Sequence, residues 1–343
     1  MTASSTSDAN GVFPVQALRA AMDAGHIAGG DAARLQPASL DLALGERALR
    51  LRASFLPGRD RKVEDVLEGL SLHEMPLAGG AVLETGCVYL VPLRERLDLP
   101  EGVAALANPK SSTGRLDVFT RVVGERAERF DTLPQGYRGR LWVEIAPRTF
   151  PILVRPGDTL VQLRLRRGAR RAVATRTVGI DLSGRLHPDG RVGYRARRHT
   201  PVVDVSSVGT HAVSAYWDPL HAPDGELVLD PEEFYILASS ETVAIPPDQA
   251  AEMAPVAPEI GEFRAHYAGF FDPGFGVNGA DSRAVLEVRG RDVPFLLRHG
   301  QPAAKLIFEP MSARPDRLYG AARSGSNYQG QALKLGKHFQ ATD

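Results

Sequence analysis

The stretch "AVLETGCVYLVPL", residues 81–93, has a counterpart in "LVLDPEEFYILAS", residues 227–239. The matching positions lie 146 residues apart and are Val82, Leu83, Tyr89 and Pro100 in the first copy and Val228, Leu229, Tyr235 and Pro246 in the second. Further on, "VEIAPRTFPILVRPGDTLVQLRL" parallels "LEVRGRDVPFLLRHGQPAAKLIF", where Glu144 matches Glu287 at an offset of 143. Several matches in the same order indicate an internal duplication.

Both copies are rich in short β-type runs that are separated by glycine and proline. Such a pattern is typical of a β-sandwich, jelly roll or barrel. One helix is expected in "FPVQALRAAMDAGHI", where Val15, Leu18, Ala21 and Met22 recur at helical spacing and Gly25 suits the helix end. We therefore predict a mainly β protein with few short helices and two tandem domains of one fold, residues 1–195 and 196–343.

The composition sets limits on location and partners. The chain has 41 basic residues (Lys and Arg) and 41 acidic residues (Asp and Glu), so its formal net charge is zero. The overall charge therefore does not favour binding to nucleic acid or to an anionic membrane. There is one cysteine, no run long and apolar enough to cross a membrane, and no signal-peptide pattern at residues 1–13. We expect a cytoplasmic protein with no nucleic-acid or membrane partner.

Eleven arginines lie between Arg164 and Arg198. A nucleic-acid arm is one interpretation, but aromatic residues are not interleaved with these arginines. A solvated strand edge and linker is the favoured interpretation.

The sequence "NPKSSTGRLDVF", residues 108–119, concentrates groups that bind anions. Lys110 and Arg115 supply charge, Ser111 and Ser112 supply hydroxyl donors, and Gly114 lets the backbone approach closely. An ordinary polar turn is the alternative, and the stretch is not a Walker loop. The corresponding residues of the second copy, "PVAPEIG" (255–261), lack these groups. Only the first copy therefore keeps the cluster.

The second copy holds different groups: "FRAHYAGFFDPGFG", residues 263–276, and "AVLEV", in which Glu287 is flanked by apolar residues. A carboxyl group in such surroundings is a candidate for a raised pKa and for proton transfer, unless it points outward from an alternating strand. The tail "RLYGAARSGSNYQGQ", residues 317–331, is either disordered or an ordered lid.

Four of these segments resemble, in the same order, those of the dCTP deaminase branch of the trimeric dUTPase fold, in its longer two-domain bacterial form. They are "LQPASLDLALG" (35–45), "PKSSTGR" (109–115), "AHYAGFFDPGFG…AVLEV" (265–288) and "NYQGQ" (327–331). The resemblance implies deamination of dCTP to dUTP and ammonia without zinc, which supplies dUTP for dUMP and thymidylate synthesis.

The resemblance also implies roles for individual residues. Glu287 would activate the water that attacks C4 of cytosine, and Ser111 would hold the water or the leaving ammonia. The nucleotide ligands would be Lys110, Ser112 and Arg115 for the triphosphate, His266, Ala268 and Asp272 for the nucleoside, and Tyr328 and Gln331 as a closing lid. Mg²⁺ would be bound through the triphosphate, with no metal ligands from the protein. A homotrimer and regulation by dTTP are further expectations.

Some features depart from the family pattern or leave alternatives open. Lys110 stands where arginine is usual, Phe270 where a polar or basic residue is common, and Asp131 with Glu144 leaves open which carboxylate acts. "FDTLPQGYRGRLWV" (130–143) resembles the dUTP diphosphatase branch, so that activity, a bifunctional enzyme forming dUMP, and a nucleotide-binding regulator are the alternatives. Because each repeat keeps one half, we expect a composite site in which Ser111, Ser112 and Arg115 of one repeat face Glu287 of another.

Overall fold

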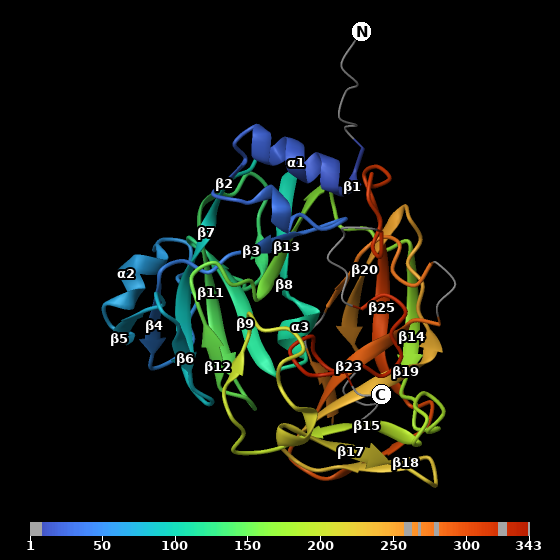
Figure 1. The fold of residues 1–343 in the computed structure, drawn as a ribbon. Coiled ribbons are helices and arrows are strands. Elements are labelled where there is room, and N and C mark those ends of the chain that lie inside the picture. Colours follow the sequence, from blue (N-terminus) through green and yellow to red (C-terminus); the bar gives the residue numbers. More distant parts are fainter. Residues whose placement is uncertain (1–8, 257–262, 267–268, 278–280, 322–327, 342–343) are drawn as a thin grey trace.

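The computed structural model describes residues 9–256, 263–266, 269–277, 281–321 and 328–341, with backbone only for 263–266. Two groups of mainly antiparallel sheets lie side by side, the first built mainly from the N-terminal half and the second from the C-terminal half (Figure 1). The predicted mainly β fold is confirmed. Among the described residues, no helix combines the length and hydrophobicity that a membrane crossing would need.

The first repeat contains two larger sheets and a small one. One sheet is β1 (Gly11–Val12), β13 (Val161–Arg167), β8 (Val103–Pro109) and β10 (Thr132–Leu133), with β3 (Leu40–Leu42) on β13. The second is β5 (Ser71–Pro76), β4 (Arg47–Leu51), β7 (Val88–Asp98), β11 (Arg138–Pro147) and β9 (Val118–Gly124), with β2 (Ile27–Ala28) on β7. The small sheet is β6 (Ala81–Leu83), β12 (Ile152–Val154) and β16 (Val203–Asp204).

The second repeat has the same three-sheet plan. Its sheets are β14 (Ala174–Gly179), β25 (Pro302–Pro310), β20 (Gln249–Pro255) and β22 (Phe270–Phe271); β17 (Trp217–His221), β15 (Arg191–Ala196), β19 (Phe234–Thr242), β23 (Arg283–Gly290) and β21 (Phe263–His266); and β18 (Glu226–Leu229) with β24 (Phe295–Arg298). β14 lies before residue 196 and β15 ends at it, yet both pair with strands that follow it. The expected boundary at residue 195 stays a prediction.

The duplication extends to strand register. Val103 pairs with Arg167 and Pro109 with Val161 in the first copy, and Gln249 pairs with Pro310 and Pro255 with Ala304 in the second. These partners are related by the offsets of 146 and 143 seen in the sequence. A buried tyrosine is repeated too, since Tyr89 Oη accepts from Glu84 N at 3.1 Å and Tyr235 Oη accepts from Asp230 N at 2.8 Å.

The described helices are few and short. α1 (Val15–Asp23) buries Val15, Leu18 and Ala21, and Gly25 follows it at φ +79°, as the sequence pattern predicted. The others are α2 (Val63–Leu67), α3 (Ser111–Gly114) and the 3₁₀ turns Ala32–Arg34 and Val213–Ala215.

One hydrophobic core joins the two repeats. It extends from the first repeat onto one face of the β15–β19–β23 sheet and onto the C-terminal segment, which is the part of the chain after β25. The second-repeat and C-terminal members are Tyr194, Ala196, Tyr216, Trp217, Phe234, Ile236, Ala238, Val285, Leu333, Leu335 and Phe339. The two repeats therefore pack as one body, with α3 of the first facing β23 of the second (Figure 1).

The repeated tyrosine hydrogen bond gives a test of equivalence. Tyr89→Phe and Tyr235→Phe should each lower the free energy of unfolding by about 1 kcal/mol, because each leaves a backbone N–H without its acceptor. Urea denaturation of the two variants measures this. A loss in only one variant would contradict the equivalence of the two turns.

Candidate functional site

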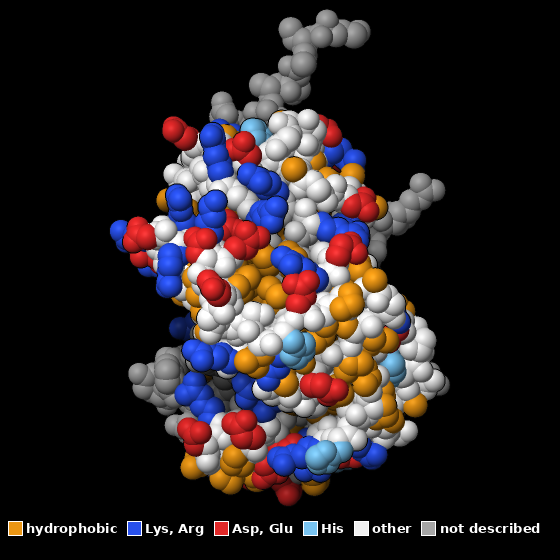
Figure 2. Space-filling view, turned by 90° about the vertical axis from the view of Figure 1, so that its left-hand side faces the viewer, with side chains coloured by type: hydrophobic (Ala, Val, Ile, Leu, Met, Phe, Trp, Pro, Cys, Tyr) orange, Lys and Arg blue, Asp and Glu red, His pale blue; other side chains and the backbone are white. Residues whose placement is uncertain are grey.

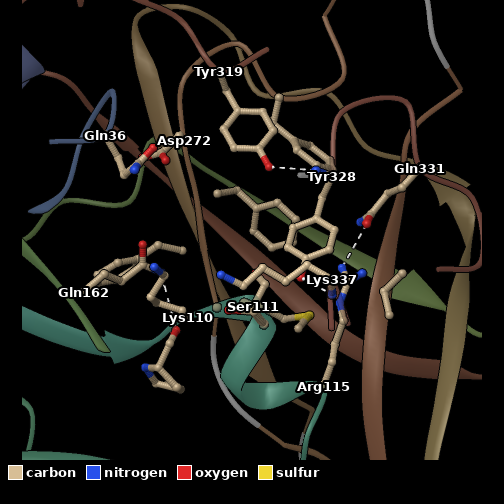
Figure 3. Close-up of a pocket in the computed structure, with 18 of the residues that line it drawn as sticks. Gln36, Lys110, Ser111, Arg115, Gln162, Asp272, Tyr319, Tyr328, Gln331 and Lys337 are labelled. Atoms are coloured by element: carbon tan, nitrogen blue, oxygen red, sulfur yellow. Dashed lines mark hydrogen bonds between the residues drawn. The ribbon is translucent and has the colours of Figure 1, made fainter. Parts of the chain in front are cut away.

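A pocket lies where the two repeats and the C-terminal segment meet (Figure 3). The first repeat contributes Gln36, Asp41, Pro109, Lys110, Ser111, Ser112, Arg115 and Gln162. The second contributes Met253, Gly269, Phe270, Phe271, Asp272, Phe275, Val285 and Glu287, and the C-terminal segment contributes Tyr319, Tyr328, Gln331 and Lys337. The expected composite arrangement is therefore present within one chain.

The anion cluster forms a single helical turn at the end of β8. Thr113 N and Gly114 N both donate to Lys110 O, and Thr113 Oγ1 donates to Leu160 O at 2.7 Å, which fixes the turn against β13. Ser111 and Ser112 both line the pocket, and Ser112 is buried. The stretch is therefore built into the pocket wall and is not an ordinary exposed turn.

Lys110 is held in place by two partners from the first repeat. Its Nζ lies 2.5 Å from Asp41 Oδ2 and 2.7 Å from Thr159 Oγ1. Asp41 belongs to the early segment 35–45, in which the sequence pattern singled out no individual residue. Lys337 also lines the pocket, and burial together with Lys110 lowers its pKa. This side of the pocket thus carries the side chains of Lys110 and Lys337 together with the carboxylate of Asp41.

Arg115 connects all three parts of the site. It is 2% exposed and points toward Tyr328 and Gln331 in Figure 3. Its Nη2 donates to Gln331 Oε1 at 2.9 Å, its Nη1 donates to Lys334 O at 2.9 Å, and its guanidinium carbon lies 3.9 Å from the centre of the Tyr328 ring. Glu287 Oε1 lies 3.9 Å from Arg115 Nε.

Glu287 is the buried carboxyl group at the centre of β23. Leu286 and Val288, the residues before and after it, point into the apolar core of the second repeat. Because side chains alternate along a strand, Glu287 points to the opposite face, toward the first repeat. Burial raises the pKa of Glu287 to about 8, although Arg115 opposes the shift. The interpretation as an outward, solvated residue is therefore wrong.

The hairpin before β23 supplies Asp272, which lines the pocket and is buried. Burial raises the pKa of Asp272, while Arg164 lowers it through an ion pair of 3.4 Å. His266 pairs with Glu287 in strand register, and nothing is described of its side chain. Ala268 lies outside the described residues, as does most of 255–261.

The C-terminal residues Tyr328 and Gln331 are seated in the site. Gln331 bridges the repeats, because its Nε2 donates to Arg283 O at 3.0 Å while its Oε1 accepts from Arg115. Tyr319 Oη accepts from Tyr328 N at 3.2 Å. Sequence reasoning did not select Tyr319, although it lies in the quoted tail "RLYGAARSGSNYQGQ". An ordered segment is thus present at these residues, and its role as a lid remains a prediction.

The equivalent surface of the first repeat is closed. Glu144 is 2% exposed, and Arg121 Nη2 donates to it at 2.8 Å while also donating to Ser54 Oγ. The Arg121 guanidinium lies 3.8 Å from the centre of the Phe130 ring. A separate apolar cluster covers this face of the sheet and includes Leu51, Phe55, Val63, Leu67, Leu90 and Trp142. Glu144 therefore faces α2 and its flanking loop and lies outside the pocket.

The dUTP diphosphatase-like residues of the first repeat also lie elsewhere. Asp131 Oδ1 accepts from Val122 N at 2.7 Å, and burial raises the pKa of Asp131 to about 7. Tyr137 Oη accepts from Glu125 N and donates to Arg140 O. Neither residue is among those that line the described pocket.

The arginine-rich segment is less solvated than its sequence suggested. Arg164 is 5% exposed, and Arg166 and Arg170 form ion pairs with Glu309. On the face seen in Figure 2, Lys and Arg side chains are interspersed with Asp and Glu over the upper part. The interpretation as a solvated edge is wrong for Arg164 and Arg166, whose side chains are 6% and 12% exposed and which hold the two repeats together. Arg170 also pairs with Glu309, but its side chain is 42% exposed.

Two copies of a dUTPase-like β fold, with a buried carboxyl group facing a cluster of anion-binding groups, define a nucleotide-handling class of protein. The family model described as the 2'-deoxycytidine 5'-triphosphate deaminase N-terminal domain matches residues 9–169, and the corresponding C-terminal domain matches residues 165–339. The chain belongs to the dCTP deaminase family.

Individual relatives agree with this assignment. A crystal structure of 2'-deoxycytidine 5'-triphosphate deaminase from Agrobacterium tumefaciens superposes with a TM-score of 0.85 at 49% identity, covering 88% of this chain and 99% of that one. The "dCTP deaminase, dUMP-forming" of Beutenbergia cavernae is 34% identical over 112 residues, which is 32% of this chain and 56% of that protein. That of Methanothermobacter thermautotrophicus is 29% identical over 142 residues, 40% of this chain and 68% of that protein. The match thus spans about half to two thirds of these shorter relatives.

The raised pKa of Glu287 gives a test that needs no substrate. Because the folded-state pKa is about 8 and the ordinary value is 4.5, folding favours the protonated group, and stability falls as pH rises through this interval. Glu287→Gln should therefore reduce the loss of stability between about pH 5 and pH 8. Urea unfolding of both proteins across this range measures it, and an unchanged slope would contradict the assignment.

Proposed function

We propose that the protein hydrolyses dCTP to dUTP and ammonia. The observation that carries the proposal is the pocket in which Glu287 of one repeat faces the turn Lys110–Arg115 of the other. Family membership supports the substrate. The two walls offer what the reaction needs, a base beside the reacting ring and cations for a triphosphate.

In the proposed mechanism, ionised Glu287 accepts a proton from water as the water oxygen bonds to C4 of cytosine, and the electron pair of the C4=N3 double bond moves to N3, which takes up that proton. Glu287 then accepts the proton of the C4 hydroxyl and delivers it to the amino group, so that C4=O forms, the bond from C4 to the amino nitrogen breaks, and ammonia leaves. A pKa of about 8 suits both steps, because the group can hold and release a proton near neutral pH. Ser111 would hold the water or the departing ammonia, and no protein-bound zinc is required.

The triphosphate would bind at the other wall. We propose Lys110, Ser112 and Arg115 as its ligands, with Mg²⁺ arriving as part of the nucleotide. Lys110 is a point charge and cannot grip two oxygens as arginine does, so Arg115 would provide the forked contact. In the structure the Arg115 fork is occupied by Gln331 Oε1 and Lys334 O. Binding would therefore require the C-terminal segment to exchange these contacts for phosphate oxygens.

His266, Ala268 and Asp272 are proposed to hold the nucleoside, and Tyr328 and Gln331 to close the site. The cavity of about 120 Å³ is below the roughly 300 Å³ at which ligand pockets begin. A rearrangement of the seated C-terminal segment would provide the room. Cytoplasmic location, a homotrimer and inhibition by dTTP remain predictions.

A bifunctional enzyme that forms dUMP is the second candidate, favoured by the names of the B. cavernae and M. thermautotrophicus relatives. The dUTP diphosphatase alternative has less support, because Asp131 and Tyr137 are bound within the first repeat. A nucleotide-binding regulator would show binding without turnover.

Product analysis separates these functions. Incubation with dCTP and Mg²⁺ should release one ammonia per dCTP, with dUTP accumulating, when products are resolved by anion-exchange chromatography. Formation of dUMP and pyrophosphate in step with ammonia would identify the bifunctional enzyme. Pyrophosphate from dUTP without ammonia from dCTP would identify a diphosphatase, and nucleotide binding without product would contradict an enzyme.

Paired variants test which carboxylate acts. Glu287→Gln should lower kcat by at least about 10²-fold, the lower range for loss of a general base, because the amide cannot accept the proton. Glu144→Gln is the matched control at the equivalent position of the other repeat and should keep kcat within about twofold, since it lies outside the pocket. Full activity of Glu287→Gln, or abolished activity of Glu144→Gln, would reverse the assignment.

A further inference from the structure

Arg164 is a buried cation that belongs to the first repeat but contacts the second. It lies on β13, two residues after the pocket residue Gln162, and its side chain is 6% exposed. The pocket-lining residues do not include it. Burying a guanidinium costs several kcal/mol unless its donors are satisfied. Both terminal nitrogens of Arg164 have acceptors, whereas its buried Nε has none among the described residues.

The contacts of Arg164 converge on β20 and on residues 270–272, which belong to the hairpin before β23. Nη1 donates to Ala251 O at 3.0 Å, and Nη2 donates to Phe271 O at 2.9 Å and to Asp272 Oδ1 at 3.4 Å. The guanidinium carbon lies 3.9 Å from the centre of the Phe270 ring. One side chain thus fixes β22 to β20 and sets the position of the Asp272 carboxylate.

The residues that Arg164 holds are those that form the pocket wall. Phe270, Phe271 and Asp272 all line the pocket. Asp272 also lies near Asp41, whose charge opposes its ionisation, and Arg164 compensates for this repulsion. Without the guanidinium, the carboxylate would lose one hydrogen-bond donor and its nearby cation, and would keep only its hydrogen bond from the backbone of Ala38.

We propose that Arg164 is a positioning residue that holds β22 and Asp272 in place to receive the sugar and base of the nucleotide. The proposal rests on the proposed function, because it assigns the hairpin to the same pocket. Arg164 touches no substrate and acts through the hairpin. Its effect should therefore appear in substrate binding more than in the chemical step.

Arg166 provides a matched control on the same strand. It also reaches the second repeat, where Nη2 donates to Glu309 Oε2 at 2.6 Å. Glu309 does not line the pocket. Replacing each arginine by lysine keeps the charge across the interface but removes the planar fork.

For Arg164→Lys we expect the KM for dCTP to rise about tenfold with kcat within about twofold, and for Arg166→Lys neither constant to change beyond about twofold. In the double variant Arg164→Lys/Asp272→Asn the effects on KM should be less than additive, because both changes remove the same interaction, the one between Arg164 and Asp272. If Arg164→Lys behaves as Arg166→Lys does, or if the effects are additive, the proposal is wrong.

A second measurement keeps this test separate from the proposed function. Without nucleotide, amide hydrogen exchange over residues 270–275 should be faster in Arg164→Lys than in wild type or Arg166→Lys. If wild-type protein does not turn over dCTP, the proposed function fails while this comparison still decides whether Arg164 holds the hairpin. If neither Arg164→Lys nor Arg164→Gln gives folded protein by circular dichroism, Arg164 is a general structural requirement and the positioning role is refuted.

Discussion

The arrangement of the site depends on the contacts that the guanidinium of Arg115 makes. This guanidinium is almost fully buried, so its N–H groups need acceptors from the segments around it. The second repeat offers Glu287, and the C-terminal segment offers Gln331 Oε1, Lys334 O and the Tyr328 ring. Satisfying this one charge ties the first repeat to two later parts of the chain, of which Gln331 lies 216 residues after Arg115.

The two repeats share strand register but use the same surface differently. In the second repeat, the sheet face that carries Val285 and Glu287 packs on the first repeat and forms the pocket. In the first repeat, the equivalent face carries Trp142 and Glu144 and is covered by α2 and neighbouring residues, with Arg121 neutralising the carboxylate. A similar strand context therefore gives Glu287 a pocket and a strongly raised pKa, and gives Glu144 an ion pair.

Sequence reasoning reached the fold, because the offsets of 146 and 143 also relate the paired strands. It also selected eight of the twenty residues that line the described pocket, because Lys110–Arg115 and Glu287 lie in short patterns with recognisable chemistry. It missed Asp41, Tyr319 and Lys337, and it took Arg164 for part of a solvated segment. Asp41 and Arg164 have partners distant in the chain, Lys110 and Asp272, which lie 69 and 108 residues away. Local patterns carry no information about such pairs, and burial decides their role.

The arrangement of both walls within one chain has a consequence for dilution. A pocket assembled from separate subunits loses its opposite wall when the protein concentration falls below the dissociation constant. Here the two walls are joined covalently through residues 168–173, which connect β13 to β14, so their encounter is intramolecular and their effective concentration is set by the length of the connection. The pocket between Arg115 and Glu287 should therefore persist at any protein concentration at which the chain remains folded.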